Sequence, residues 1–153
     1  MKKTIILAVL MLAASALLAQ SEKEAQEAIK QVILSAYVDG IQNNGEQEKI
    51  DAGFHPGFRL LGVGQGNEMW ELPIYSWKER VAKDVAEGKK PRKAEEAVSV
   101  KFLDVDVTGN AAVVKLEFYV GEKLTFIDYI SLYKFEEGWK IVSKIFYRFP
   151  EQE

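Results

Sequence analysis

Apolar residues in the first part of the chain recur every three or four positions. This holds for Ala25, Ala28, Ile29, Val32, Ile33, Ala36, Tyr37 and Ile41. Such spacing predicts one amphipathic helix. Ser21 and Glu24 have the spacing of a capping box, which would begin this helix, and Asn43-Asn44-Gly45 is a suitable end.

The pattern changes between residues 47 and 88. A short helical turn is expected over residues 47–52, ended by Gly53. Apolar residues on both sides of Gly64-Gln65-Gly66-Asn67 predict a hairpin within residues 57–75. Ser76 and Glu79 form a second candidate capping box, and they predict a helix from Trp77 to about Glu87 that stops at Gly88.

From residue 98 onward, apolar and polar residues alternate. The alternation slips once at Phe102, as a β-bulge would produce, and turn sequences occur at residues 109–110, 121–122 and 136–138. These features predict a meander of four strands. Helices followed by an antiparallel sheet define an α+β fold with the helices on one sheet face. Trp139 and Ile141 are expected to pack under those helices.

The first nineteen residues have the order of a secretory signal peptide. Lys2 and Lys3 precede an apolar run over residues 5–14, and the stretch closes on small and apolar residues before Gln20. The alternative is an N-terminal membrane anchor, because the run is near the lower length limit for crossing a bilayer. We expect cleavage before Gln20. The product would be a single domain of residues 20–153, periplasmic or secreted, without stable membrane insertion.

The composition of the chain excludes some classes of metal site and argues against one class of partner. The 153-residue chain has no cysteine and one histidine, so thiolate or histidine-rich metal sites are excluded. We expect no metal and no cofactor. Residues 20–153 carry 18 basic and 23 acidic residues, a net charge of −5, which argues against nucleic acid as a partner. The basic stretch at residues 89–93 could bind an anion, but because acidic residues flank it, it is interpreted as a solvated loop.

Several short motifs accompany this order of elements: Phe54-His55-Pro56, Ser76-Trp77, Asp128-Tyr129-Ile130-Ser131-Leu132 and Gly138-Trp139-Lys140-Ile141. With them, the chain over about residues 22–148 resembles the nuclear transport factor 2-like superfamily, and within it the putative lumazine-binding family. The resemblance implies a cone-shaped, cystatin-like α+β fold with a small-molecule pocket. Related enzymes of ketosteroid-isomerase and dehydratase type use an Asp, or an Asp with a His, inside the cone.

Asp128 and His55 are the candidate proton-transfer groups. Asp128 shares a strand row with Leu124, Phe126, Ile130 and Leu132. A carboxylate in an apolar row must be paired or have a raised pKa. The opposite row is also partly apolar, so the sequence does not decide which row faces the core. On the outer face, Asp128 would be solvated or paired with a lysine. His55 is a candidate general base or ligand donor because it is the one imidazole of the chain, although a structural histidine bonded to the backbone is the alternative.

Two functions remain. The first is an exported, noncatalytic domain that binds a small organic molecule in an apolar pocket between helices and sheet, with Trp70, Trp77, Phe126 and Ile130 as ligand-binding residues. The second is a small isomerase- or dehydratase-type enzyme in which Asp128 and His55 converge on one substrate. Because helices cover only one face of a sheet that is apolar on both, we also expect a homodimer through the outer face.

Overall fold

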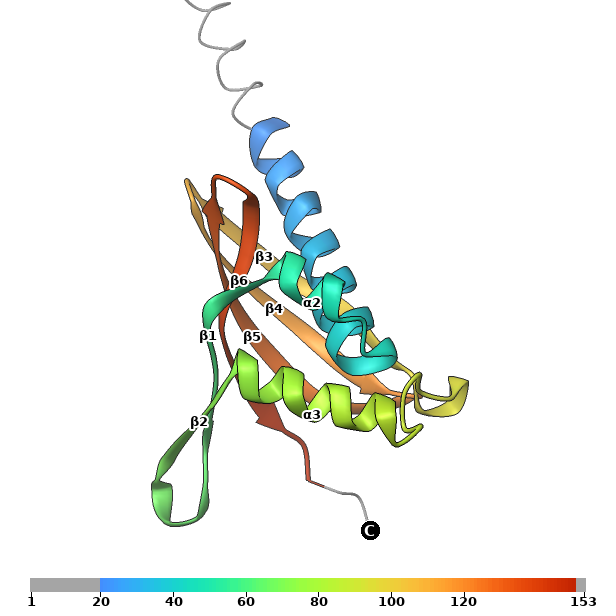
Figure 1. The fold of residues 1–153 in the computed structure, drawn as a ribbon. Helices are drawn as coiled ribbons and strands as arrows, with labels where there is room; N and C mark the ends of the chain where they lie inside the picture. The colour runs from blue at the N-terminus through green and yellow to red at the C-terminus, as the bar shows by residue number, and fades with distance from the viewer. Residues whose placement is uncertain (1–19, 151–153) are drawn as a thin grey trace, which may run out of the picture.

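A curved six-stranded sheet carries the helices on one face (Figure 1). The computed structural model describes residues 20–150, and the predicted signal peptide lies outside them. The strand order is β2-β1-β6-β5-β4-β3. All neighbouring strands are antiparallel except β1 and β6, which pair in parallel. The predicted α+β fold is therefore confirmed. The sheet is mixed and not purely antiparallel, because β1 of the hairpin pairs in parallel with β6.

The first helix follows the predicted apolar stripe. Residues 20–32 are α-helical, and the helix continues as the π-helical segment η1 (Ile33–Asn44), which ends at Gly45 with φ 76°. Its buried side chains are those of Ile29, Ile33, Ala36, Tyr37, Val38 and Ile41, whereas Ala28 is exposed. The capping-box prediction is wrong, because Gln20 and Ser21 are already helical and Gln20 pairs with Glu24 one turn later.

The hairpin and the two further helices form close to where the pattern predicts them. The helix α2 (Gln47–Gly53) is followed by β1 (Phe54–Val63), a short 3₁₀ turn η2 (Gln65–Asn67) and β2 (Met69–Pro73). The helix α3 (Ile74–Ala86) begins three residues earlier than expected, with Pro73 and not Ser76 as its N-cap. The second capping box is therefore also wrong, since Ser76 already lies inside the helix, and the extended residue before the helix is Pro73, with ψ 153°.

The four-stranded meander is confirmed. After the 3₁₀ turn η3 (Ala94–Glu96) it comprises β3 (Val98–Thr108), β4 (Ala111–Val120), β5 (Lys123–Phe135) and β6 (Gly138–Arg148). The register of β3 against β4 shifts between Phe102 and Asp104, at the predicted bulge. Within residues 20–150, no helix is both long and apolar enough to cross a membrane.

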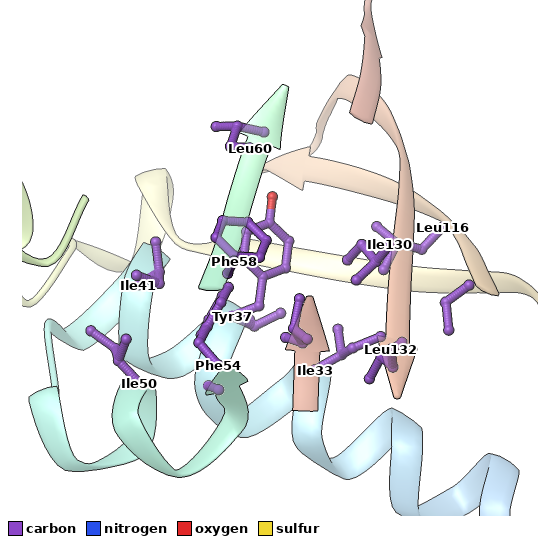
Figure 2. Packing of buried hydrophobic residues seen from close by; sticks show 14 of the residues in the cluster. Ile33, Tyr37, Ile41, Ile50, Phe54, Phe58, Leu60, Leu116, Ile130 and Leu132 are labelled. Atoms are coloured by element: carbon purple, nitrogen blue, oxygen red, sulfur yellow. The ribbon is translucent and has the colours of Figure 1, made fainter. Parts of the chain in front are cut away.

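The inner face of the sheet and the helices enclose one hydrophobic core. Its members include Ile33, Tyr37, Ile41, Ile50, Phe54, Phe58, Leu60, Leu116, Ile130 and Leu132 (Figure 2). Trp139 and Ile141 are buried in it, as the sequence predicts. The outer face instead exposes apolar side chains, among them Tyr129, Tyr133 and Tyr147. The row of Asp128 is therefore the inner row.

Candidate functional site

A buried ionic cluster lies between the first helix and the inner face of the sheet. Asp128 is fully buried. Lys144 Nζ donates to Asp128 Oδ1 at 2.6 Å, and Tyr37 Oη donates to Asp128 Oδ2 at 2.7 Å. Both carboxylate oxygens therefore have a donor, which is the condition under which a buried charge is tolerated. The sequence argument required a paired or a perturbed carboxylate, and the structure shows a paired one.

Three elements position this cluster. Tyr37 extends from η1, and its hydroxyl points toward the Leu60 end of the core (Figure 2). Asp128 lies in β5, directly between Leu116 of β4 and Phe146 of β6. The π-helical turn is uncommon in proteins, and in this chain it presents both Tyr37 and Gln42 to the site.

A bulge in β6 brings Lys144 into the cluster. Strict alternation from the buried Trp139 and Ile141 would place Lys144 on the outer face. The pairing with β5, however, moves from Leu132 opposite Ile141 to Ser131 opposite Ser143, so Val142 is an extra residue. Beyond this bulge Lys144 is buried, while Ile145 and Tyr147 are exposed.

Burial controls the protonation behaviour of the donors. It lowers the pKa of Lys144, and the negative charge and hydrogen bond of Asp128 act in the opposite direction. The pKa of Tyr37 is raised well above its ordinary value, first by burial and then by Asp128, with a hydrogen bond from the Gln42 side chain acting against them. Tyr37 therefore remains a neutral hydrogen-bond donor at physiological pH.

Aromatic rings surround the ammonium group of Lys144. Its Nζ lies 5.0 Å from the ring centroid of Phe146, 5.1 Å from that of Tyr37, and 5.8 and 5.9 Å from those of Phe126 and Phe118. These are cation–π distances. The rings also contact one another edge to face, as Phe126 and Phe146 do with centroids 5.5 Å apart, so they hold the cation in an ordered aromatic shell.

A pocket of about 230 Å³ opens beside this shell. Its lining comes from η1 and α3, from the segment that follows α3, and from strands β1, β4, β5 and β6. The lining residues are Tyr37, Gln42, Leu60, Trp77, Arg92, Phe118, Val120, Phe126, Lys144 and Phe146. Asp128 does not line the pocket, because Lys144 and Tyr37 lie between its carboxylate and the open space.

The basic segment after α3 forms the edge of this pocket. Arg92 Nε donates to the carbonyl oxygen of Gln42 at 2.8 Å, and the backbone N–H of Arg92 donates to that of Asn43 at 2.9 Å. Lys90 is buried and donates to the same Gln42 oxygen. The solvated-loop interpretation is wrong for these two residues, because the carbonyl groups at the end of η1 need donors.

The predicted ligand-binding residues divide into two groups. Trp77 and Phe126 line the pocket. Ile130 is part of the closed core. Trp70 is partly exposed on β2, where it packs over Gly62 and contacts Phe146 with ring centroids 6.1 Å apart. The structure therefore brings Trp77 and Phe126 together at one site and places Ile130 and Trp70 outside its lining.

His55 lies at a different part of the molecule. Its Nδ1 accepts a hydrogen bond from the Gly57 N–H at 3.0 Å, and its ring stacks on Phe135 with centroids 4.8 Å apart. Phe135 follows Asp128 by seven residues in β5, a separation of ~23 Å along an extended strand. The expected convergence of Asp128 and His55 on one substrate is therefore not found.

A larger surface depression, of about 490 Å³, surrounds His55. Two of its charged groups contact each other at the surface: Lys140 donates to the carbonyl of Ala52 at 2.7 Å and lies 3.6 Å from the exposed Glu137 carboxylate. No group of three or more His, Asp or Glu side chains in the described part of the chain could hold a metal ion. The aromatic pocket, which has a buried ion pair behind it, is the better candidate site.

Sequence reasoning missed four polar residues of this site: Lys144, Tyr37, Gln42 and Arg92. Tyr37 was recognised only as a core position of the helical stripe. A signal for it was present, because a buried tyrosine hydroxyl needs a hydrogen-bond partner. Arg92 belongs to the basic stretch for which anion binding was the alternative, but nothing local indicated its contact with the distant end of η1. Nothing local indicated Lys144 either, because its burial depends on a bulge.

Solved structures define the class of protein. At 25% identity, a structure described as an NTF2-like protein of unknown function from Shewanella baltica OS155 has a TM-score of 0.60, over 82% of this chain and 94% of that one. A second NTF2-like protein of unknown function, from Silicibacter pomeroyi DSS-3, has a TM-score of 0.62 at 19% identity, over 86% and 98%. The fold is that of the NTF2-like, or nuclear transport factor 2-like, proteins.

The family follows from the sequence itself. Residues 24–147 match the model of the putative lumazine-binding family, and the chain belongs to that family. Another structure of the same fold is described as a putative dehydratase from Streptomyces avermitilis, with 15% identity, a TM-score of 0.56 and coverage of 85% and 99%. None of the curated proteins matches the chain.

Proposed function

We propose that this protein is an exported, noncatalytic domain that binds a small organic molecule in the pocket between η1, α3 and the inner face of the sheet. The observation that carries the proposal is a pocket lined mainly by aromatic and aliphatic side chains, with a few hydrogen-bonded polar groups among them. This combination is typical of small-molecule sites. Membership of the putative lumazine-binding family supports the same class of ligand.

The noncatalytic role is inferred from the groups that face the pocket. A general base must come within hydrogen-bond reach of the proton that it removes. Among the described residues that line the pocket, none is an aspartate, a glutamate or a histidine. Asp128 is covered by its two donors, and His55 is remote. The isomerase or dehydratase alternative therefore lacks the pair on which it was based.

The binding proposal is tested by closing the pocket. Val120 lines it at the end of β4, so Val120→Phe would place a ring in the open volume. Val63→Phe, at an exposed position of β1, adds the same ring elsewhere. We would search for molecules that copurify with the protein by native mass spectrometry and screen neutral, anionic and cationic aromatic fragments by ligand-observed NMR.

Binding that is lost in Val120→Phe and kept in Val63→Phe supports the proposal. If no fragment and no copurifying molecule distinguishes Val120→Phe from the wild type, the proposal is wrong. Export has a separate test, the intact mass of protein recovered from the exported fraction. Cleavage before Gln20 predicts the mass of residues 20–153, whereas a mass of the full chain would contradict it.

We also propose that two copies associate through the outer face of the sheet. Val113, Tyr129, Tyr133, Ile145 and Tyr147 all expose their side chains there, by 37% to 56%. Tyr129 lies opposite Ile145 in the pairing of β5 with β6, so these exposed positions adjoin one another. Adjoining apolar side chains on an exposed sheet face favour burial against a partner.

A further inference from the structure

We infer that the ligand of the pocket is a flat aromatic anion, with its ring among the aromatic side chains and its acidic group at Lys144 and Arg92. This inference rests on the proposed function and names the class of ligand. It follows from the charges that face the pocket, from the hydrogen-bond donors left unused there, and from the shape of the walls.

The charges facing the pocket are positive. Its described lining contains Lys144 and Arg92 but no acidic side chain. The one carboxylate nearby, that of Asp128, is fully buried, and each of its oxygens already accepts a hydrogen bond. A ligand in the pocket would therefore meet the ammonium group of Lys144 and not the carboxylate behind it.

The ammonium group of Lys144 has N–H donors that are not used in the hydrogen bond to Asp128. An ammonium group carries three N–H donors, and within residues 20–150 the hydrogen bond and ion pair found for Lys144 go to Asp128 alone. Its other neighbours are ring faces, which stabilise the charge without accepting a strong hydrogen bond. An anionic oxygen in the pocket would supply the acceptor that the rings lack.

Two hydrogen bonds fix Arg92 at the edge of the pocket. Its Nε and its backbone N–H are fixed by the carbonyl groups of Gln42 and Asn43. No ion pair of Arg92 is found among the described residues, so the two terminal NH₂ groups of its guanidinium are left for a ligand. A guanidinium fixed in this way is suited to a carboxylate or a similar acid.

The walls favour a ring. Trp77, Phe118, Phe126 and Phe146 line the pocket from α3, β4, β5 and β6. Aromatic side chains attract a flat ligand through stacked or edge-to-face contacts. The volume of about 230 Å³ is slightly below the usual range for ligand pockets, which indicates a small molecule.

A pair of probes that differ in charge tests the inference. We would measure the binding of 2-naphthoate and of its neutral analogue 2-naphthamide by tryptophan fluorescence and ligand-observed NMR. The wild type is expected to bind the naphthoate at least about tenfold more tightly, a difference of about 1.4 kcal/mol. Arg92→Gln should reduce this preference at least about threefold, through a loss of naphthoate affinity larger than any change for the amide, and the urea unfolding midpoint of the variant shows separately that it is folded.

Arg80→Gln, at an exposed arginine of α3 outside the lining, is the matched control and should keep the preference. Arg92→Lys should retain part of it, because the charge remains while the forked geometry is lost. Equal affinity for both probes in the wild type, with binding sensitive to Val120→Phe, would overturn the inference and leave the proposed function standing. So would a pocket that binds only cationic fragments. If nothing binds in a way that Val120→Phe alters, both fail.

Discussion

The side chains of the buried ionic cluster depend strongly on one another. Asp128 and Lys144 are both almost completely removed from water, and each is the ion-pair partner of the other. Replacing a buried pair by apolar residues is often nearly neutral, whereas removing one member leaves an uncompensated charge. The stability of this protein should therefore depend above all on whether a charge in its interior is left without its partner.

We predict that Asp128→Leu and Lys144→Met each lower the free energy of unfolding by about 3–5 kcal/mol. The double variant should be more stable than either single variant, because it removes both charges together. Urea unfolding of the four proteins provides the double-mutant cycle. Lys101→Met, which removes the exposed member of an ion pair with Glu117, is the control and should cost less than about 1 kcal/mol. Additive costs for the two buried positions would contradict this interpretation.

Tyr37 makes a second prediction, on pH dependence. Its pKa in the folded protein lies well above the ordinary value of 10.0. Above pH 10 the unfolded chain therefore releases a proton that the folded protein retains, and the free energy of unfolding falls as pH rises. The decrease is at most about 1.4 kcal/mol per pH unit for this proton. Below pH 10 Tyr37 contributes no slope.

Tyr37→Phe isolates this effect. The difference in unfolding free energy between wild type and variant should be constant at neutral pH and should shrink above pH 10. Denaturant unfolding over a series of alkaline pH values measures it. The lowered pKa of Lys144 acts in the opposite sense, since a lysine that loses its proton more easily when folded favours the folded state as pH rises. A difference that stays constant through alkaline pH would show that Tyr37 titrates normally.

At the scale of the elements, the end of η1 is where helix, loop and α3 meet. Gly45 terminates η1 with φ 76°, and a Cβ atom there would lie 2.3 Å from Val85 Cγ2 of α3. Lys90 and Arg92, from the loop after α3, donate hydrogen bonds to the Gln42 carbonyl at the same end of η1. The positions of Gln42 and Arg92 at the pocket therefore depend on a glycine that allows both the left-handed backbone and the close approach of α3.

Two glycines separate these two requirements. Gly45 and Gly88 both have positive φ, at 76° and 70°, but a Cβ atom at Gly88 would have no atom within 4 Å. Gly88→Ala is expected to cost about 1 kcal/mol from backbone strain alone. Gly45→Ala should cost about 1–3 kcal/mol more, because overpacking is added. Thermal or urea unfolding compares the two, and equal costs would mean that α3 shifts away freely.

For the whole molecule, the sheet separates two environments. Helices cover its inner face (Figure 1), which holds the core and the pocket. Its outer face exposes the tyrosine side chains of β5 and β6. Successive side chains of a strand point to opposite faces, so residues adjacent in sequence lie in opposite environments. A ligand site and an association surface can therefore share one sheet without sharing side chains.

The proposed dimer is tested by a charge on the outer face. The wild type should have the mass of a dimer in light scattering at micromolar concentration, and Ile145→Lys should shift it to a monomer because a lysine cannot be buried there without a partner. Val63→Lys, at an exposed position in β1, is the control and should remain dimeric. A monomeric wild type would refute the dimer. Naphthoate binding should persist in Ile145→Lys, since the pocket lies on the opposite face.

Local patterns in the sequence determined the order of the elements. The helical stripe through Ile29, Ile33 and Tyr37, the alternation in the meander and the bulge at Phe102 were all recognisable, because each depends on neighbours within a few residues. Helix starts were the exception. Ser21 and Ser76 have the spacing of caps, but a cap forms only where the preceding backbone leaves the helix, and at both positions it does not.

The site itself was decided by tertiary structure. Both rows of β5 are partly apolar, so only the covering helices determine that Asp128 points inward. The extra residue Val142 reverses the facing of β6 and buries Lys144 beside it. Arg92 reaches the pocket because carbonyl groups at the end of η1, fifty residues away in sequence, need its donors. Such contacts join segments distant in the chain, and no pattern of nearby residues encodes them.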